Sequence, residues 1–319
     1  MAERVIFHVD ANSAFLSWSA AYRVKVLGEE LDLRTVPSVV AGDKESRHSI
    51  ILAKSGPAKK YGIQTGEPLF LALEKCPDLK IVEPDYSLYV ECSRHFVEVL
   101  RQFSPCVEQY SIDEAWVDMT GTQRLFGPPV LAADALRRKV LDELGFTVNV
   151  GISSNKLLAK MAGDFEKPNK IHTLFPEEIP SKMWPLPVKD LFLVGSATER
   201  KLRLLGIYTI GDLAKADPVL LRRKLGKHGE TIWHYANGRN AELVTPEPAE
   251  AKGFGNSVTT ARDVVSTEEA HQVLLSLMET AAMRMRREGK YGSCVAVHLR
   301  TNEFHHFSHQ SKLNCATNI

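Results

Sequence analysis

Apolar residues recur along this chain in two kinds of pattern. One consists of short apolar runs and of strict alternation with polar residues, and the other is the spacing of a helix face. The runs and the alternation predict strands over 4–9, 36–40, 49–53, 80–82 and 146–152. Helical spacing predicts helices over 14–26, 57–61, 68–75, 86–103, 130–144 and 155–164, and Asn12 and Ser13 are the N-cap candidates of the first. The order β-α-insert-α-β-α-β is typical of an antiparallel sheet backed by helices, within an α+β fold.

The second half of the chain changes character after a proline-rich connection over 176–187. Residues 191–240 read as all-helical, and a linker rich in Pro and Glu follows over 244–250. A strand from residue 253, a helix over 267–288 and strands over 293–300 and 304–309 are expected beyond it. Because 319 residues exceed one comfortable core, we predict several domains.

Two carboxylates stand side by side at Asp113 and Glu114, within an otherwise apolar stretch over 110–119. Neighbouring strand residues point to opposite faces, so a turn or a kink is needed to bring both to one edge. A third acid, Asp10, ends the first predicted strand. Carboxylates held together repel, and hard oxygen ligands suit Mg²⁺ or Mn²⁺. We therefore predict that the three acids meet on one sheet and hold two metal ions for phosphoryl transfer. The competing interpretation is an ordinary surface Asp-Glu pair.

The composition favours a polyanionic partner and gives no indication of a membrane-spanning segment. The chain is 44% apolar and 25% charged, with a formal net charge of +1. The helical segment over 191–240 nevertheless holds nine basic against four acidic residues, which favours a polyanion. Five scattered cysteines without CxxC spacing indicate a reduced intracellular protein. No signal or membrane-spanning run is present, so we expect a cytoplasmic monomer.

Histidines near the C-terminus raise the alternative of a zinc site. They lie near two cysteines, at His298, His305, His306, His309, Cys294 and Cys315. Their spacing fits no zinc finger, and alternating strand faces divide the set, so an exposed hairpin is the preferred interpretation.

Four ordered blocks carry a family resemblance. They are His8-Val9-Asp10 with an aromatic five residues on, the run over 58–63 (AKKYGI), Ser111-Ile112-Asp113-Glu114-Ala115, and the run from 151 (GISSNK) through Ala159-Lys160 to Lys167-Pro168-Asn169. In order and spacing they resemble the Y-family (DinB/UmuC-like) translesion DNA polymerases. The resemblance runs from about Arg4 into the last predicted domain.

That resemblance implies a right-hand DNA polymerase. Its parts would be a palm with a ferredoxin-like core (1–21 and 85–175), fingers (22–84), a helix-hairpin-helix thumb (176–243) and a little finger (251–319). The implied reaction adds a dNMP to a primer 3′-OH with release of pyrophosphate, as error-prone synthesis past damage without proofreading. The implied partners are primer-template DNA and a dNTP. The implied cofactor is two Mg²⁺ ions, with Mn²⁺ as a substitute.

The resemblance also assigns residues to the reaction. Asp10, Asp113 and Glu114 would hold the metals together with the main-chain carbonyl of Ala11. The nucleotide would lie against the helix N-terminus, whose free amides suit triphosphate oxygens. The nucleotide-binding residues that the resemblance implies here are Ala11, Asn12, Ser13, Ala14 and Phe15. Phe15 would exclude a ribose 2′-hydroxyl because its ring fills the space that the hydroxyl requires; its alternative is a core aromatic.

Two lysines, Lys59 and Lys167, match family positions that contact the triphosphate, where cations neutralise developing charge. In isolation each reads as a solvated surface lysine. The sequence departs from common family members at four positions. Lys59 stands for arginine, which removes the bidentate fork. Gly56 stands for a frequent tyrosine, Asn12 for a second acid that is not a metal ligand, and Glu67 for an apolar residue.

The segment over 193–198, with its continuation to 213, resembles a helix-hairpin-helix. In that unit backbone N–H groups of a hairpin contact DNA phosphates without reading sequence. The candidate contacts are Gly195, Ala197 and Lys201, with Ala197 or Ser196 in place of the second hairpin glycine. The alternative is a plain helical pair joined by a tight turn.

Two further hypotheses compete with the polymerase. One is a non-catalytic DNA-binding relative of the same fold, which the short last domain and Gly56 favour and the acid triad disfavours. The other is a nucleotide cyclase, which has no need of a basic helical domain. We expect the little finger to be incomplete, because the family's continues with a second helix and a final strand. Lesion and nucleotide preference and engagement of a sliding clamp are left open.

Overall fold

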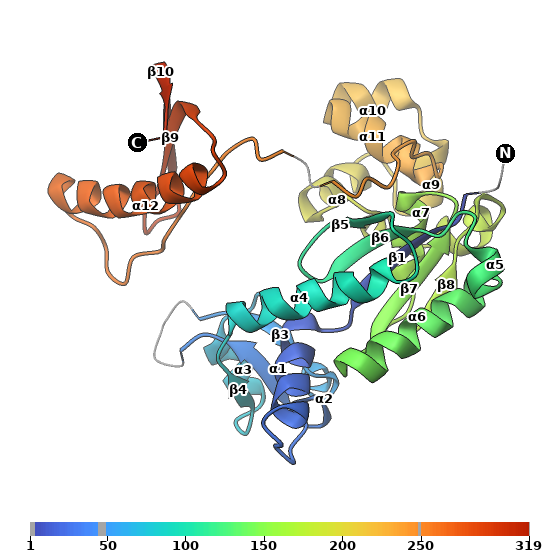
Figure 1. Ribbon diagram of the computed structural model, residues 1–319. Coiled ribbons are helices and arrows are strands. Elements are labelled where there is room, and N and C mark those ends of the chain that lie inside the picture. Colours follow the sequence, from blue (N-terminus) through green and yellow to red (C-terminus); the bar gives the residue numbers. More distant parts are fainter. Residues whose placement is uncertain (1–3, 44–48, 248–249, 319) are drawn as a thin grey trace. The chain divides into compact units, whose positions relative to one another are not determined.

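The computed structural model describes residues 4–43, 49–247 and 250–318, which form two compact units divided near residue 248 (Figure 1). Residues 44–48, which lie between the strands predicted over 36–40 and 49–53, are outside the described part of the chain. Predicted and observed element bounds differ by a few residues in most cases, as is usual at frayed ends.

A five-stranded sheet organises the first unit. Its order is β5-β6-β1-β7-β8, with β1 antiparallel to both of its neighbours and β7 parallel to β8. The strands are β1 (Ile6–Ala11), β5 (Val107–Gln109), β6 (Glu114–Asp118), β7 (Val148–Ser153) and β8 (Ile171–Thr173). This is a sheet of ferredoxin-like type, as the family resemblance implied.

Helices cover the two faces of this sheet differently. The β1 side chains of Phe7 and Val9 belong to the main core, as do residues of α4 (Tyr86–Arg101) and α6 (Pro129–Leu144). On the other face, Ile6 packs with Ala159 of α7 (Lys156–Gly163). Since side chains alternate along a strand, His8 and Asp10 share the α7 face with Ile6.

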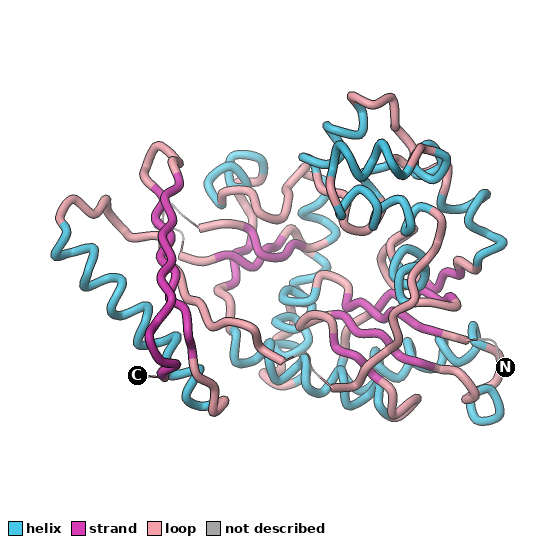
Figure 2. The backbone as a smooth tube through the Cα atoms, turned by 90° about the horizontal axis from the view of Figure 1, so that it is seen from above, coloured by secondary structure: helices cyan, strands magenta, loops and turns pink. Residues whose placement is uncertain are grey.

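The insert after the first helix forms a small α+β region. Its three-stranded sheet has the order β3-β2-β4 and can be followed in Figure 2. The insert follows α1 (Ala14–Lys25), and its elements are η1 (Leu33–Thr35), β2 (Ser38–Ala41), β3 (Ile51–Lys54), α2 (Gly56–Lys60), α3 (Leu69–Lys75) and β4 (Lys80–Val82). A separate core of buried residues, including Val39, Ile51, Ile63 and Leu69, holds the region together.

The segment over 191–240 is helical, as the sequence predicted, and its apolar core is shared with residues of α7, among them Leu158 and Met161. Its elements are α8 (Ser196–Arg203), α9 (Ile210–Lys215), α10 (Pro218–Leu225) and α11 (Lys227–Ala236), preceded by η2 (Pro176–Glu178), η3 (Ile179–Met183) and η4 (Val188–Asp190). A short helix, α5 (Gln123–Phe126), precedes α6. Thr209 and Asp212 form a capping box at the start of α9, satisfying N–H groups that a helix leaves free.

The predicted linker over 244–250 is not free at its start. Val244 is buried against Ile6 and Trp116, and its carbonyl accepts from Cys106 Sγ at 3.3 Å. Thr245 N donates to Glu108 Oε2 at 2.9 Å. The chain after the helical segment is therefore attached to the large sheet, and 248–249 lie outside the described residues.

The second unit contains α12 (Thr267–Arg287) and a hairpin of β9 (Gly292–Arg300) and β10 (His306–Thr317). The strand predicted from residue 253 is wrong. Within the described residues the sheet of this unit has only β9 and β10, and the segment over 253–260 pairs with neither of them. The last strand, predicted over 304–309, runs to Thr317 because it pairs with β9 along that length. The histidines lie along this exposed hairpin.

Candidate active site

Two of the three predicted acids are cross-strand neighbours. Asp10 of β1 stands opposite Glu114 of β6 in the antiparallel register, and such residues share one face of a sheet. Asp113 lies in the turn just before β6, and its carbonyl accepts from Ala11 N at 2.9 Å. Because Asp113 is not within the regular strand, the alternation of faces does not separate it from Glu114. The turn that the sequence required is present.

Glu114 is held by two donors. His8 Nε2 lies 2.8 Å from Glu114 Oε2, and Lys160 of α7 donates to the same oxygen. Only 15% of the Glu114 side chain is exposed. Burial alone would raise its pKa, but the hydrogen bonds and charges of these two partners outweigh it and lower the pKa to about 2. Glu114 is therefore ionised at neutral pH.

Asp10 is paired with Lys167, which also contacts Asp164 at 2.8 Å. Burial raises the pKa of Asp10, with Asp113 adding to the effect and Lys167 opposing it. Burial alone would lower the pKa of Lys167, but the carboxylates of Asp10 and Asp164 raise it above its ordinary value. The third acid, Asp113, accepts from Ser111 Oγ at 2.6 Å. Each acid thus has a partner in the chain itself.

These oxygens fit a divalent cation by their chemistry. Three carboxylates at one sheet end form a hard donor set, and the cationic groups of Lys160 and Lys167 show that the cluster attracts positive charge. As they stand, no three His, Cys, Asp or Glu side chains in the described ranges form a metal-binding group. Lys167 donates to Asp10 Oδ2 and Lys160 to Glu114 Oε2, so a bound metal would compete with these two lysines for the carboxylates.

Asn12 has a role that the sequence did not indicate. Its side chain is buried, and its Nδ2 donates to Asn149 Oδ1 at 3.0 Å while its Oδ1 accepts from Asn169 N at 2.9 Å. Both ends of the amide are used. Asn12 therefore joins the end of β1 to the loop that carries Lys167, and its side chain is not available to a nucleotide.

We expect Asn12→Asp, which introduces the acid found in many family members, to destabilise this chain. The carboxylate loses the donor to Asn149 and places two acceptors face to face. Asn149 cannot simply turn over, because its own Nδ2 donates to the carbonyls of Gly163 and Glu166. The expected loss is about 1–3 kcal/mol in the free energy of unfolding, measured with urea. Asn314→Asp, the same change at an exposed position, is the control. Equal stability of both variants would contradict the assignment.

The predicted nucleotide residues follow directly after Asp10. Ser13 is the N-cap of α1 in the left-handed conformation (φ 50°) and gives no side-chain cap. The amides of Ala14 and Phe15 open the helix and lack intrahelical acceptors. The Phe15 ring stacks on Tyr89 with centroids 4.6 Å apart and lies edge-on to Tyr86. These surroundings are compatible with both interpretations of Phe15, as the residue that excludes a ribose 2′-hydroxyl and as a core aromatic.

Other predicted residues lie elsewhere. Lys59 is exposed on α2 and, within the described residues, makes no ion pair with the three acids or with any other carboxylate. Gly195 is the N-cap of α8, which contains Ala197 and Lys201. The sequence missed one feature there: Leu193 has φ 71°, a region that favours glycine.

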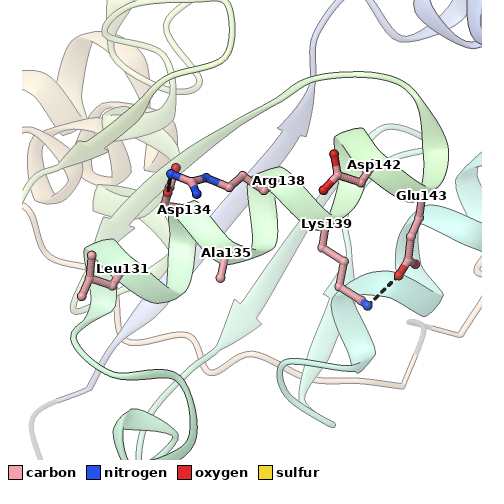
Figure 3. A pocket seen from close by; sticks show the side chains of 7 residues that line it. All are labelled: Leu131, Asp134, Ala135, Arg138, Lys139, Asp142 and Glu143. Atoms are coloured by element: carbon pink, nitrogen blue, oxygen red, sulfur yellow. Dashed lines mark ion pairs between the residues drawn. The ribbon is translucent and has the colours of Figure 1, made fainter.

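A pocket on the exposed side of α6 contains none of the predicted site residues. It is lined by Leu131, Asp134, Ala135, Arg138, Lys139, Asp142 and Glu143 (Figure 3). Arg138 pairs with Asp134 at 2.7 Å, and Lys139 with Glu143 at 2.6 Å. Its charges are therefore largely neutralised along one helix, and we assign no chemistry to it.

Comparison with known proteins decides the family. The chain matches the family model of the impB/mucB/samB family over residues 9–164, that of its C-terminal domain over 251–319, and the IMS family HHH motif over 176–207. It is 47% identical to DNA polymerase IV of Clostridium acetobutylicum, over 98% of this chain and 78% of that protein. The chain belongs to the Y family of DNA polymerases. DNA polymerase IV of Clostridium kluyveri is 38% identical, over 96% of this chain and 75% of that protein.

A solved Y-family DNA polymerase chimera shares the fold of this Y-family polymerase. The TM-score is 0.83 at 22% identity, over 98% of this chain and 88% of the other. Membership implies a DNA-directed DNA polymerase that depends on divalent metal and binds DNA. None of the comparisons favours the non-catalytic alternative. None of the helices in the described part of the chain has the length and apolar character that crossing a bilayer requires.

Proposed function

We propose that this Y-family polymerase extends a primer 3′-OH by template-directed addition of dNMP, through two-metal phosphoryl transfer in error-prone synthesis past damage, without proofreading. The observation that carries the proposal is the placement of Asp10, Asp113 and Glu114 at one end of adjacent strands. The amides that open α1 follow directly in the chain, and the Lys167 loop contacts Asp10.

The proposed cofactor is two Mg²⁺ ions, with Mn²⁺ as a substitute. They would be held by the three acids and the carbonyl of Ala11, and would activate the attacking oxygen and neutralise phosphate charge. The chain's own groups supply the rest. Lys167, once released from Asp10, gives a cation to the triphosphate, and Lys59 gives another. The first amides of α1 bind phosphate oxygens, and His8 with Lys160 orients Glu114.

The helical segment is the proposed DNA-binding thumb. The amides near Gly195 and Ala197 and the ammonium of Lys201 would contact backbone phosphates, which suits a polymerase because such contacts carry no sequence preference. We propose the division into palm, fingers, thumb and little finger at the boundaries predicted from the sequence. A monomer in the cytoplasm is likewise a proposal, supported for the location by five free cysteines. Contact with a sliding clamp stays open.

Primer extension tests this function. The chain is incubated with a primer-template, Mg²⁺ and one dNTP at a time, and the products are resolved on a gel. We expect extension only by the dNTP complementary to the template base, full inhibition by EDTA and partial recovery with Mn²⁺. Absence of extension under all conditions, or formation of a cyclic nucleotide from the free triphosphate, would refute the proposal.

We expect Phe15→Leu to weaken discrimination against ribonucleotides. The smaller side chain leaves room for a 2′-hydroxyl, while its apolar character preserves most of the packing against Tyr89. The ratio of kcat/KM for dNTP to that for rNTP should fall roughly 10- to 100-fold, as expected when a steric clash of this size is removed. Tyr86→Leu, which alters the neighbouring ring, is the control. An unchanged ratio for Phe15→Leu would leave Phe15 as a core aromatic.

A further inference from the structure

The loop over 62–67 joins α2, which carries Lys59, to α3. It begins and ends with left-handed glycines, Gly62 (φ +73°) and Gly66 (φ +86°). Two backbone hydrogen bonds attach its far end to β3: Gly66 N donates to Ile51 O at 2.8 Å, and Ile51 N donates to Glu67 O at 2.9 Å. The end of the loop next to α2 is held in another way.

Charged side chains hold that end. Lys54 Nζ donates to Ile63 O at 2.5 Å, and Lys75 Nζ donates to Gly62 O at 3.1 Å. Lys75 also donates to Glu67 Oε2 at 2.5 Å, and the other oxygen of Glu67 accepts from Gln64 N at 3.0 Å. Glu67 therefore ties Lys75 and the loop backbone together, and only 13% of its side chain is exposed.

The surrounding charge explains why an acid is needed there. Burial lowers the pKa of Lys54, and the neighbouring Lys59 and Lys75 lower it further, while Glu67 opposes them. Burial alone would raise the pKa of Glu67, but hydrogen bonds from Lys75 and Gln64 N outweigh it and keep the acid ionised. An apolar residue at position 67, as in common family members, would leave three lysines of the fingers without this compensating charge.

We propose that Glu67, held by Lys75, is a positioning residue for Lys59 in nucleotide binding. It fixes the loop that follows α2, whose Gly62 N donates to Lys59 O at 3.0 Å, and offsets the charge of Lys54, so that the backbone carrying Lys59 is held in one place for the incoming triphosphate. The inference rests on the proposed function, in which Lys59 contacts the triphosphate. It also gives a reason for the acid at position 67.

Steady-state primer extension by the full chain tests the inference. Glu67→Gln keeps an acceptor for Gln64 N but loses the charge. It should raise the KM for dNTP about fivefold, the size expected for a partly exposed ion pair, and leave kcat within about twofold. Lys75→Met, which removes the same pair from its other side, should act in the same direction. Glu74→Gln, the same charge change on an exposed neighbour, should leave both constants unchanged.

A double variant separates positioning from simple destabilisation. If Glu67 acts through Lys59, Lys59→Ala with Glu67→Gln should have the KM of Lys59→Ala alone, because coupled residues are not additive. Additive effects, or a fall in kcat with unchanged KM, would overturn the inference. If Lys59→Ala raises KM and Glu67→Gln does not, the inference fails alone. If Lys59→Ala leaves KM unchanged, the proposed role of Lys59 in the function fails with it.

Discussion

Asp113→Ala is expected to lower the kcat of primer extension by at least about 1,000-fold, because it removes one of the proposed ligands of the metal ions that would stabilise the transferred phosphoryl group. Asp113 is a cleaner target than the other two acids. Within the described residues its side chain is bonded only to the nearby Ser111. Replacing Glu114 would instead remove the carboxylate partner of Lys160, and replacing Asp10 would remove one of the two carboxylates at Lys167. The fold should therefore persist in the variant.

Two measurements accompany that experiment. Mn²⁺ binding, followed by electron paramagnetic resonance, should weaken in Asp113→Ala. This measurement does not depend on turnover. Asp142→Ala, a change of the same type at an exposed position on α6, should match the native chain in both metal binding and rate. Equal extension by the native chain and by Asp113→Ala would remove this residue from the catalytic centre and with it the proposed mechanism.

Gly151→Ala is expected to destabilise the chain by about 3 kcal/mol or more in the free energy of unfolding. A Cβ at this position would lie 2.0 Å from the carbonyl oxygen of Ala159 and 2.4 Å from Gly163 N, both backbone atoms of α7. Neither side can yield easily, because β7 lies between β1 and β8. Since α7 also carries Lys160, a displaced helix should reduce primer extension as well.

Urea unfolding measures this effect, and Gly56→Ala supplies the control. Gly56 lies at the start of α2 with no atom near the position of an added Cβ, so alanine should be tolerated or slightly stabilising. A Gly151→Ala chain as stable as the native one would show that α7 can move away from the sheet without cost. That result would contradict the close approach seen between them.

Sequence reasoning went furthest where function depends on order and spacing along the chain. The apolar stretch with Asp113-Glu114, and Asp10 at the end of a strand, predicted acids that share a sheet, and the structure places them on adjacent strands. Lys160 and His8 were within the quoted motifs, yet the sequence assigned them no partner. Their contact with Glu114 depends on α7 lying across the face of the sheet to which His8 and Glu114 point.

The errors have a similar origin. The strand predicted from residue 253 has suitable local composition, but a strand exists only where another strand can pair with it. The motif assigned Asn12 to the nucleotide but gave no sign that its side-chain amide bonds to Asn149 and Asn169, which lie far along the chain. Leu193 adopts a glycine-like conformation that no local pattern announces.

The sequence by itself determined most of the elements and pointed to the family and to three candidate acids, because periodicity and motif spacing are properties of the chain. Only the tertiary structure decided which cation holds which carboxylate, that Asn12 supports the Lys167 loop, and that Glu67 ties Lys75 to the loop after α2. The physical reason is that hydrogen bonds and ion pairs act over a few ångströms. Their partners are therefore chosen by the packing of segments that the linear order leaves far apart.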